Sequence, residues 1–223
     1  MFFPIGDDNV KGGSFPLFSY GFILLNIAVF VFQSSLPGGQ LQSFVETYGS
    51  VPHEITQGQD WFTLLTCMFL HGSWMHLIGN MLFLWIFADN IEAVIGNFRF
   101  FIFYVSGGLM ASFAHIFFNW SSSVPMVGAS GAISAVLGAY LVLFPASRIK
   151  VLFFIFPFHV PALLFLVLWI GEQFVNGIGE LNIQTAATSG VAWWAHIGGF
   201  VFGLLAGFYF RNTRGIRFEL ERE

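Results

Sequence analysis

Long runs of apolar residues without charges dominate this 223-residue sequence, in which 56% of residues are hydrophobic and only 9% are charged. A helix needs about 20 apolar residues to cross roughly 30 Å of bilayer hydrocarbon. A soluble domain of this size would expose too many of the 31 Phe and 7 Trp residues to stay dispersed. The sequence therefore predicts an all-α polytopic membrane protein with six transmembrane helices, approximately Phe15–Leu36, Ser73–Ala88, Phe100–Trp120, Val127–Phe144, Val151–Ile170 and Trp193–Phe210.

The third and fourth spans form one uncharged stretch, and the division between them rests on a turn signal. Ser121-Ser-Ser-Val-Pro125 is a serine run that ends in proline, a pattern typical of turns. The six spans then place every basic residue on one side of the membrane. These residues are Lys11 before the first span, Arg99, Arg148 and Lys150 in the even-numbered loops, and Arg211, Arg214, Arg217 and Arg222 after the last span.

Basic residues mark the cytoplasmic side of a membrane protein, so both termini are expected in the cytoplasm. The expected location is the inner membrane of a prokaryotic cell. The N-terminus lacks the positively charged start of a cleavable signal peptide, which indicates that the first span is retained. The expected organisation is a cytoplasmic tail over residues 1–14, a membrane domain over 15–210 and a second cytoplasmic tail over 211–223.

Composition also excludes some partners. The net charge is −4, and no basic cluster is large enough to follow a nucleic-acid backbone. A single cysteine, Cys67, excludes an internal disulfide. Neither a metal nor another cofactor is expected.

The first outward loop, Pro37 to Gly72, is unusually long and ends in an apolar segment that starts at Trp61. The uncharged stretch from Trp61 to Ala88 exceeds one crossing. We expect part of this loop to associate with the membrane interface, with Trp61 at headgroup level. The alternative is a longer, tilted second helix.

Polar residues inside spans are costly and are functional candidates by default. The second, fourth and sixth spans all run inward from the outer surface, so residues shortly after their starts share one depth. Ser130 and His196 each lie three residues after a span start, about 5 Å below it. His76 lies at a similar depth and Asn80 about one turn lower, so four polar side chains from three helices can meet in one layer.

The chemistry of these four residues is complementary. A serine hydroxyl needs a base to become a nucleophile, and His196 can serve Ser130 in this way. The oxyanion formed by attack on a carbonyl needs donors, which His76 and Asn80 can supply because residues i and i+4 share a helix face. The backbone N–H of Ser130, in a first helical turn, is a third donor. No acidic residue lies at this depth, so the arrangement would be a dyad.

Simpler interpretations exist for each residue. Small residues let membrane helices approach closely, and Ser130 in the GASGAISAVLGA segment fits a packing face by itself. His115 and His159 are interpreted as structural histidines. His71 and His76 form a conceivable metal pair, but five residues apart on a helix they diverge more than an i, i+4 pair does.

The motifs together resemble a known family. HGSWMHLIGNMLFLWIF from His71, GASG from Gly128 and AHIGGFVFG from Ala195 look like the three signature regions of rhomboid intramembrane serine proteases. The resemblance covers Trp61 to Gly207 and is similar to the minimal six-helix prokaryotic form. It implies that Ser130 is the nucleophile and His196 the general base, that His76 and Asn80 belong to the oxyanion site, and that Gly128 leaves room for the substrate backbone.

Two further positions match the family and two depart from it. Glu92 and Gly96 match a glutamate and glycine that often follow the second span, and we interpret them as structural. Many members have Trp-Arg in the first loop, where this chain has Trp61-Phe-Thr63. Some members carry an aromatic residue four positions after the nucleophile, on which the catalytic histidine stacks. That position is Ser134 here, so another group must orient His196.

The resemblance implies hydrolysis of peptide bonds in or next to transmembrane helices of membrane-protein substrates. Because a helix hides its carbonyls, the cleaved segment must unwind first. The first loop and the fifth span, loosened by Pro157 and Pro161, are candidate gates for entry. The alternative in a different class is a catalytically silent rhomboid-like membrane-protein binding or chaperone protein, and a small channel or transporter comes third.

Other intramembrane protease classes are poorly supported. The nearest approach to a zinc motif HExxH is His53-Glu-Ile-Thr-Gln57, which ends in glutamine and lies in a loop. An aspartyl protease needs two aspartates within the spans, whereas the aspartates here, Asp7, Asp8, Asp60 and Asp89, all lie outside the predicted spans.

Overall fold

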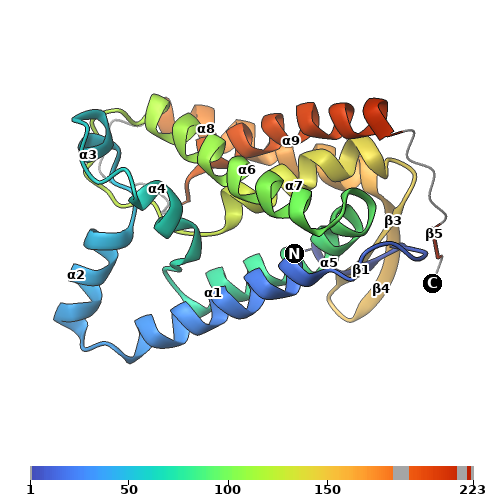
Figure 1. The fold of residues 1–223 in the computed structure, drawn as a ribbon, viewed down its shortest axis with the longest axis horizontal. Helices are drawn as coiled ribbons and strands as arrows, with labels where there is room; N and C mark the ends of the chain where they lie inside the picture. Colours follow the sequence, from blue (N-terminus) through green and yellow to red (C-terminus); the bar gives the residue numbers. More distant parts are fainter. Residues whose placement is uncertain (1, 183–190, 215–219, 222–223) are drawn as a thin grey trace.

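The computed structural model describes residues 2–182, 191–214 and 220–221, and in this part of the chain five helices are long and apolar enough to span a membrane. They surround a shorter apolar helix, α7 (Figure 1). The prediction of a polytopic helical bundle is therefore confirmed. The long helices are α1 (Leu17–Ser35), α5 (Trp74–Ile95), α6 (Asn97–Phe118), α8 (Ala162–Asn182) and α9 (Trp193–Arg214), and α7 covers Ser130–Leu143. Residues 183–190, between the fifth and sixth predicted spans, and most of the C-terminal tail lie outside the described residues.

Helix α7 is the buried centre of the bundle. Every residue from Gly131 to Tyr140 is buried, and the helix packs against α5, α6 and α9. Its 14 residues measure only about 21 Å, less than the thickness of the bilayer hydrocarbon. A loop rather than a helix leads up to Ser130, and its neighbours Ala129 and Gly131 are buried, so the first turn of α7 begins inside the bundle.

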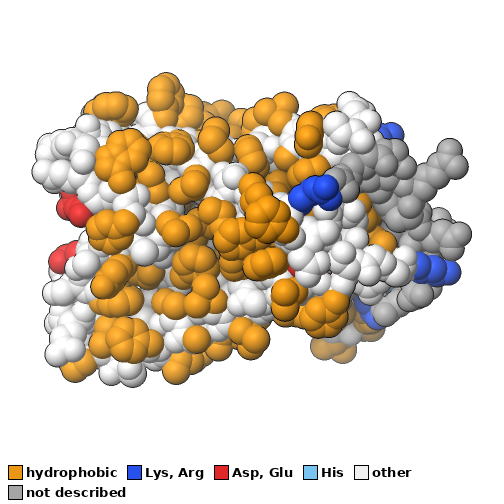
Figure 2. All heavy atoms as spheres, in the orientation of Figure 1, with side chains coloured by type: hydrophobic (Ala, Val, Ile, Leu, Met, Phe, Trp, Pro, Cys, Tyr) orange, Lys and Arg blue, Asp and Glu red, His pale blue; other side chains and the backbone are white. Residues whose placement is uncertain are grey.

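The outer surface of the molecule is apolar along the sides of the helices. Figure 2 shows hydrophobic side chains over the middle of the visible face, acidic side chains at one end and Lys and Arg side chains at the other end, where β1 and β3 lie. Large side chains such as Leu24, Met75 and Leu168 are exposed. An apolar belt between polar ends is the surface that a multi-pass membrane protein presents to lipid.

The fifth predicted span is wrong in its position. Residues 148–161 form a β-hairpin of β3 (Arg148–Phe153) and β4 (Phe156–Pro161), and α8 begins only at Ala162. Alternate residues Ile149 and Val151 are buried, which is the period-2 pattern of a strand. Pro157 and Pro161 lie in β4, an edge strand where a missing N–H is tolerated. They therefore do not loosen a transmembrane helix, and the prediction of a gate loosened by these prolines is wrong.

The hairpin joins the N-terminal segment in a sheet with strand order β1-β3-β4. Strand β1 (Phe2–Asp7) runs antiparallel to β3, with a register shift between Pro4 and Gly6. His159 lies opposite Lys150 in this sheet rather than in a span. A second pair, β2 (Asn9–Val10) with β5 (Leu220–Glu221), brings the two terminal segments together at the same end of the bundle.

The first long loop folds into short helices instead of extending the second span. They are α2 (Gly38–Tyr48), α3 (Pro52–Thr56), α4 (Thr63–Thr66) and the 3-10 helix η1 (Cys67–Phe69). The backbone becomes extended at Leu70, so the alternative of one long tilted helix is wrong. Leu64 and Met68 are buried, while Trp61 and Phe62 are about half exposed. The loop thus fixes its apolar end on the bundle and leaves aromatic side chains at the surface.

The buried carboxylate of Glu92 holds the start of α1. Its two oxygens accept hydrogen bonds from the backbone N–H groups of Phe18 and Ser19 at 2.9 and 2.7 Å, and from the Ser19 hydroxyl at 2.6 Å. The first N–H groups of a helix lack partners within the helix and favour a negative charge. Gly96 has a φ of 84° at the sharp junction between α5 and α6. Both residues are structural, as expected.

The half-buried carboxyl group of Asp7, at the opposite end of the bundle from α2, predicts that stability depends on pH. Burial raises the pKa of Asp7 from 3.8 to about 8, and Asp89 and Asp8 add to the increase. The folded protein then binds more protons than the unfolded chain between these pH values, so stability should fall as pH rises from about 4 to about 8. Asp7→Asn should reduce the difference in Tm between about pH 5 and pH 8. An equally large difference in this variant would contradict the prediction, and Asp60→Asn, at an exposed loop position, is the control.

Candidate active site

Ser130 and His196 face each other across the contact between α7 and α9. The Ser130 Oγ atom lies 2.8 Å from the Nε2 atom of His196. His196 is buried and Ser130 is half-buried, so the imidazole is largely shielded while the hydroxyl keeps some access. The structure thus brings together the two residues that the sequence predicted as a dyad, although they are separated by 66 positions.

Glycines make this close contact possible. A methyl group added to Gly199 would overlap the carbonyl oxygen of Gly131, and one added to Gly203 would overlap that of Ala135. In the reverse direction, a methyl group on Gly138 would overlap the Phe200 carbonyl. The backbones of α7 and α9 therefore touch, as small residues allow between membrane helices, and this contact holds the histidine beside the serine.

His76 and Asn80 lie on the other side of the serine loop, next to Gly128. A methyl group on Gly128 would approach two ring atoms of His76 to 2.8 Å and the side-chain nitrogen of Asn80 to 3.6 Å. Gly128 has a φ of 129°, a conformation that side chains disfavour, and its N–H donates to the Cys67 carbonyl at 2.9 Å. Glycine is therefore required here both for the backbone conformation and for the close contact with His76.

One hydrogen bond to the imidazole ring of His76 indicates which ring nitrogen is a donor. Its Nδ1 accepts from the backbone N–H of Gly72 at 3.4 Å, and Ser73 caps the helix by accepting from the His76 N–H at 3.1 Å. With Nδ1 as acceptor, the neutral ring carries its proton on Nε2. That nitrogen is one of the two ring atoms beside Gly128.

Asn80 is held by a histidine that the sequence did not assign to the site. Its Nδ2 donates to the Nε2 of His71 at 2.9 Å. His71 is fully buried, and burial lowers its pKa to about 3, with His76 adding to the decrease, so it stays neutral and can accept this bond. Gln33 of α1 fixes His71 in turn, because its amide nitrogen donates to the His71 carbonyl at 2.7 Å. His71 is thus a support for Asn80.

The group that contacts the far side of His196 is Gln173 of α8. The Nδ1 atom of His196 lies 2.7 Å from the Gln173 Oε1 atom. Trp169 and Trp193 flank the imidazole, with ring centroids 5.9 and 6.2 Å away. Ser134 points elsewhere, since its hydroxyl donates to the Ser130 carbonyl at 2.6 Å.

Gln173 was not predicted from the sequence because the candidates there were mainly ionisable groups, and Gln173 is neutral. The available signal was the spacing Trp169–Gln173–Gly177, which places an aromatic, an amide and a glycine along one helix face.

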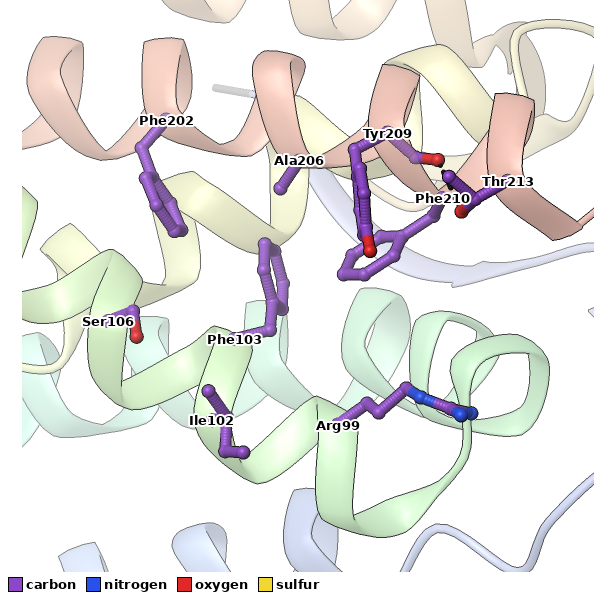
Figure 3. Close-up of a pocket in the computed structure, with 9 residues that line it drawn as sticks. All are labelled: Arg99, Ile102, Phe103, Ser106, Phe202, Ala206, Tyr209, Phe210 and Thr213. Carbon is purple, nitrogen blue, oxygen red and sulfur yellow. Dashed lines mark hydrogen bonds between the residues drawn. The ribbon is translucent and has the colours of Figure 1, made fainter.

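His115 is not a member of the predicted dyad, but it acts electrostatically on His196. His115 is buried in α6, where its Nδ1 atom lies 3.4 Å from the side-chain Nδ2 atom of Asn119, one turn away. The pocket of about 650 Å³ between α6 and α9 is lined by Phe103 and Phe202, with Arg99 at one end, and includes none of the candidate site residues (Figure 3). No group of three or more potential metal ligands occurs within the described residues.

Comparisons with known proteins agree with the motifs. The family model of the Rhomboid domain matches residues 58–213. Rhomboid protease GluP of Bacillus subtilis is 34% identical over 126 residues, which are 56% of this chain and 24% of GluP. RHOMBOID-like protein 4 of Arabidopsis thaliana is 33% identical over 155 residues, 70% of this chain and 35% of that protein. Rhomboid protein 1, mitochondrial, of Saccharomyces cerevisiae is 28% identical over 199 residues, 85% of this chain and 52% of the yeast protein.

The chain spans between about a quarter and about half of the length of these three relatives. The matched family region begins in the first loop, covers α5 to α8 and reaches the end of α9, and it contains Ser130, His196, His76, Asn80 and Gly128. The domain match, the six-helix bundle and the relatives agree, and the chain therefore belongs to the rhomboid family.

Proposed function

We propose that this chain is an intramembrane serine endopeptidase that hydrolyses peptide bonds in or next to transmembrane helices of membrane proteins. The observation that carries the proposal is the 2.8 Å contact between Ser130 Oγ and His196 Nε2 within a membrane bundle. A hydroxyl at hydrogen-bond distance from a histidine nitrogen is the arrangement of an activated serine. A catalytically silent binding protein would have no need for this pair, which makes that function the weaker candidate.

The proposed reaction divides between the two residues. His196 Nε2 takes the Ser130 proton as the hydroxyl oxygen attacks the carbonyl carbon of the scissile bond. The same nitrogen then gives the proton to the departing amine, which leaves the acyl group esterified to Ser130. Water, deprotonated by His196, releases the acyl group as a carboxylic acid and restores the serine. No cofactor takes part in these steps.

Three donors support the proposed oxyanion site. Ser130 is the first residue of α7, so its backbone N–H has no acceptor within the helix. The Nε2–H of His76 and the second Nδ2–H of Asn80 flank Gly128 on the same side. Donors of this kind stabilise the charge that develops on the carbonyl oxygen. Gly128 is proposed to give the substrate backbone room beside Ser130, because it has no side chain.

The proposed orientation places both termini in the cytoplasm. All eight Lys and Arg residues then lie on the cytoplasmic side, with residues 15–210 as the membrane domain between the tails 1–14 and 211–223. The dyad is then nearer the outer surface, in the inner membrane of a prokaryotic cell. Substrates would be transmembrane segments with helix-weakening residues, because their carbonyls must be released before attack.

Labelling with a fluorophosphonate probe tests the proposal directly. The purified protein in detergent should be labelled covalently, because the probe reacts with activated serines, and it should cleave a single-span reporter protein. Ser130→Ala should not be labelled. Ser112→Ala, which removes another buried serine hydroxyl of the bundle, is the matched control and should be labelled normally. A wild-type protein that neither reacts with the probe nor cleaves reporters would favour the silent binding protein.

Loss of the Asn80 amide should impair catalysis more than binding. Asn80→Ala is expected to lower kcat for reporter cleavage by about 10²-fold with little change in KM, since one oxyanion donor contributes on that scale. The matched control is Asn26→Ala, which removes a buried amide on α1 that donates to the Phe22 carbonyl. An unchanged kcat in Asn80→Ala would remove this residue from the proposed oxyanion site.

A further inference from the structure

Gln173 forms a bridge between α8 and the imidazole of His196. Its side chain is buried, with an exposed fraction of 4%. Its Oε1 lies 2.7 Å from His196 Nδ1, and its Nε2 donates to the Trp169 carbonyl at 3.0 Å. Both ends of the amide are therefore engaged, one within α8 and the other across to α9.

These two bonds together select one form of the histidine. A side-chain amide has a donor end and an acceptor end. The Trp169 carbonyl can only accept, so it requires the NH₂ end and leaves Oε1 for the imidazole. Because Oε1 of Gln173 is an acceptor, the Nδ1 atom that faces it must carry the proton. The neutral ring then presents the lone pair of Nε2. That lone pair is 2.8 Å from the Ser130 hydroxyl, which is the geometry of a general base.

We propose that Gln173 is a positioning residue that holds His196 in the Nδ1–H form with Nε2 directed at Ser130. It takes the place of the aromatic support that Ser134 cannot supply. The inference rests on the proposed protease function, but the hydrogen bonds that define it can be measured without catalysis.

A neutral amide orients the base without adding a charge. The other titratable groups that act on His196 are also histidines, His76 of α5 and His115 of α6, and Glu172, next to Gln173 in sequence, is exposed. Unlike a carboxylate, Gln173 cannot stabilise the imidazolium that forms during attack by opposite charge. Replacing the amide by a carboxylate should therefore keep the orientation but change the basicity of His196.

Gln173→Leu and Gln173→Glu separate these two properties. Gln173→Leu removes the acceptor and leaves the Nδ1–H unpaired, and it should lower kcat for reporter cleavage by about 10- to 100-fold with KM little changed. Gln173→Glu should restore most of this loss, because the carboxylate accepts the same bond. Its charge favours imidazolium, so the acid limb of the pH–rate profile should move upward by about one pH unit or more. A purely structural role would not move this limb.

The matched control is Asn176→Leu, which removes a side-chain amide one turn further along α8 that donates to the Glu172 carbonyl within the same helix. Its kcat and pH profile should equal those of the wild type. Wild-type kcat in Gln173→Leu, or an unshifted acid limb in Gln173→Glu, would overturn the proposal. Thermal stability measured for each variant distinguishes a loss of orientation from a loss of folding.

Nitrogen-15 NMR of histidine-labelled protein provides a test that does not depend on activity. The wild type should show His196 with a protonated Nδ1 and an unprotonated Nε2, and Gln173→Leu should show a mixture of both forms. The opposite form in the wild type would overturn the role of Gln173. If the wild type has the expected form but cleaves no substrate, the proposed function fails while the assignment of the hydrogen bond stands.

Discussion

Ser130→Ala is expected to reduce cleavage of a transmembrane reporter by at least about 10³-fold, and His196→Ala by a similar factor. Removing a member of a nucleophile–base pair abolishes the chemistry of the pair and leaves only the contribution of binding and the oxyanion donors. The hydroxyl and the imidazole are 2.8 Å apart, so each is expected to depend on the other.

Dependence of this kind has a measurable signature. The double variant Ser130→Ala/His196→Ala should be little worse than either single variant, because effects of residues that act as one unit do not add. Rates should be measured with reporter and enzyme in the same liposomes. If the losses in the single variants multiply in the double variant, the two residues act independently and the dyad is wrong. His115→Ala, which removes a buried histidine of α6, is the matched control for His196→Ala.

Gly199→Ala is expected to lower both stability and activity, because it forces α7 and α9 apart one turn from the dyad. The added methyl group would overlap the Gly131 carbonyl, which is backbone and cannot rotate away. Overpacking of this type costs about 1–3 kcal/mol. A displacement of about 1 Å at the base can cost about 10²-fold in rate, so activity should fall even in the fraction of molecules that stays folded.

The structure also provides controls for this prediction. Gly171 of α8 and Gly79 of α5 have nothing within 4 Å of an added methyl group, so Gly171→Ala and Gly79→Ala should retain wild-type stability. Gly203→Ala, which meets the Ala135 carbonyl further from the dyad, should lose stability with a smaller direct effect on the chemistry. Thermal unfolding and reporter cleavage, measured on the same preparations, check both parts. Wild-type activity in Gly199→Ala would show that the site does not depend on this contact.

The sequence predicted most helices because hydropathy over about 20 residues is a strong signal. It failed at the fifth span for a physical reason. The segment from Arg148 to Pro161 is apolar and aromatic, and a short apolar run fits a strand as well as a helix. Pro157 and Pro161 are the available signal for a strand here, because proline is tolerated in an edge strand. Because α8 starts later than the predicted span, the helix face that carries Gln173 was not evident from the sequence.

The membrane class, the family and the candidate nucleophile and base follow from the sequence alone, because hydropathy, the positions of charges and the spacing of motifs can be read along the chain. It also indicated that the small-residue segment around Ser130 can pack closely against another helix. The packing of the helices in three dimensions starts α7 inside the bundle, places His71 against Asn80 and brings Gln173 to His196. These features depend on which faces of separate helices meet. A neutral amide such as Gln173 cannot be recognised in the sequence as part of a site, because its role depends on the residue that it contacts.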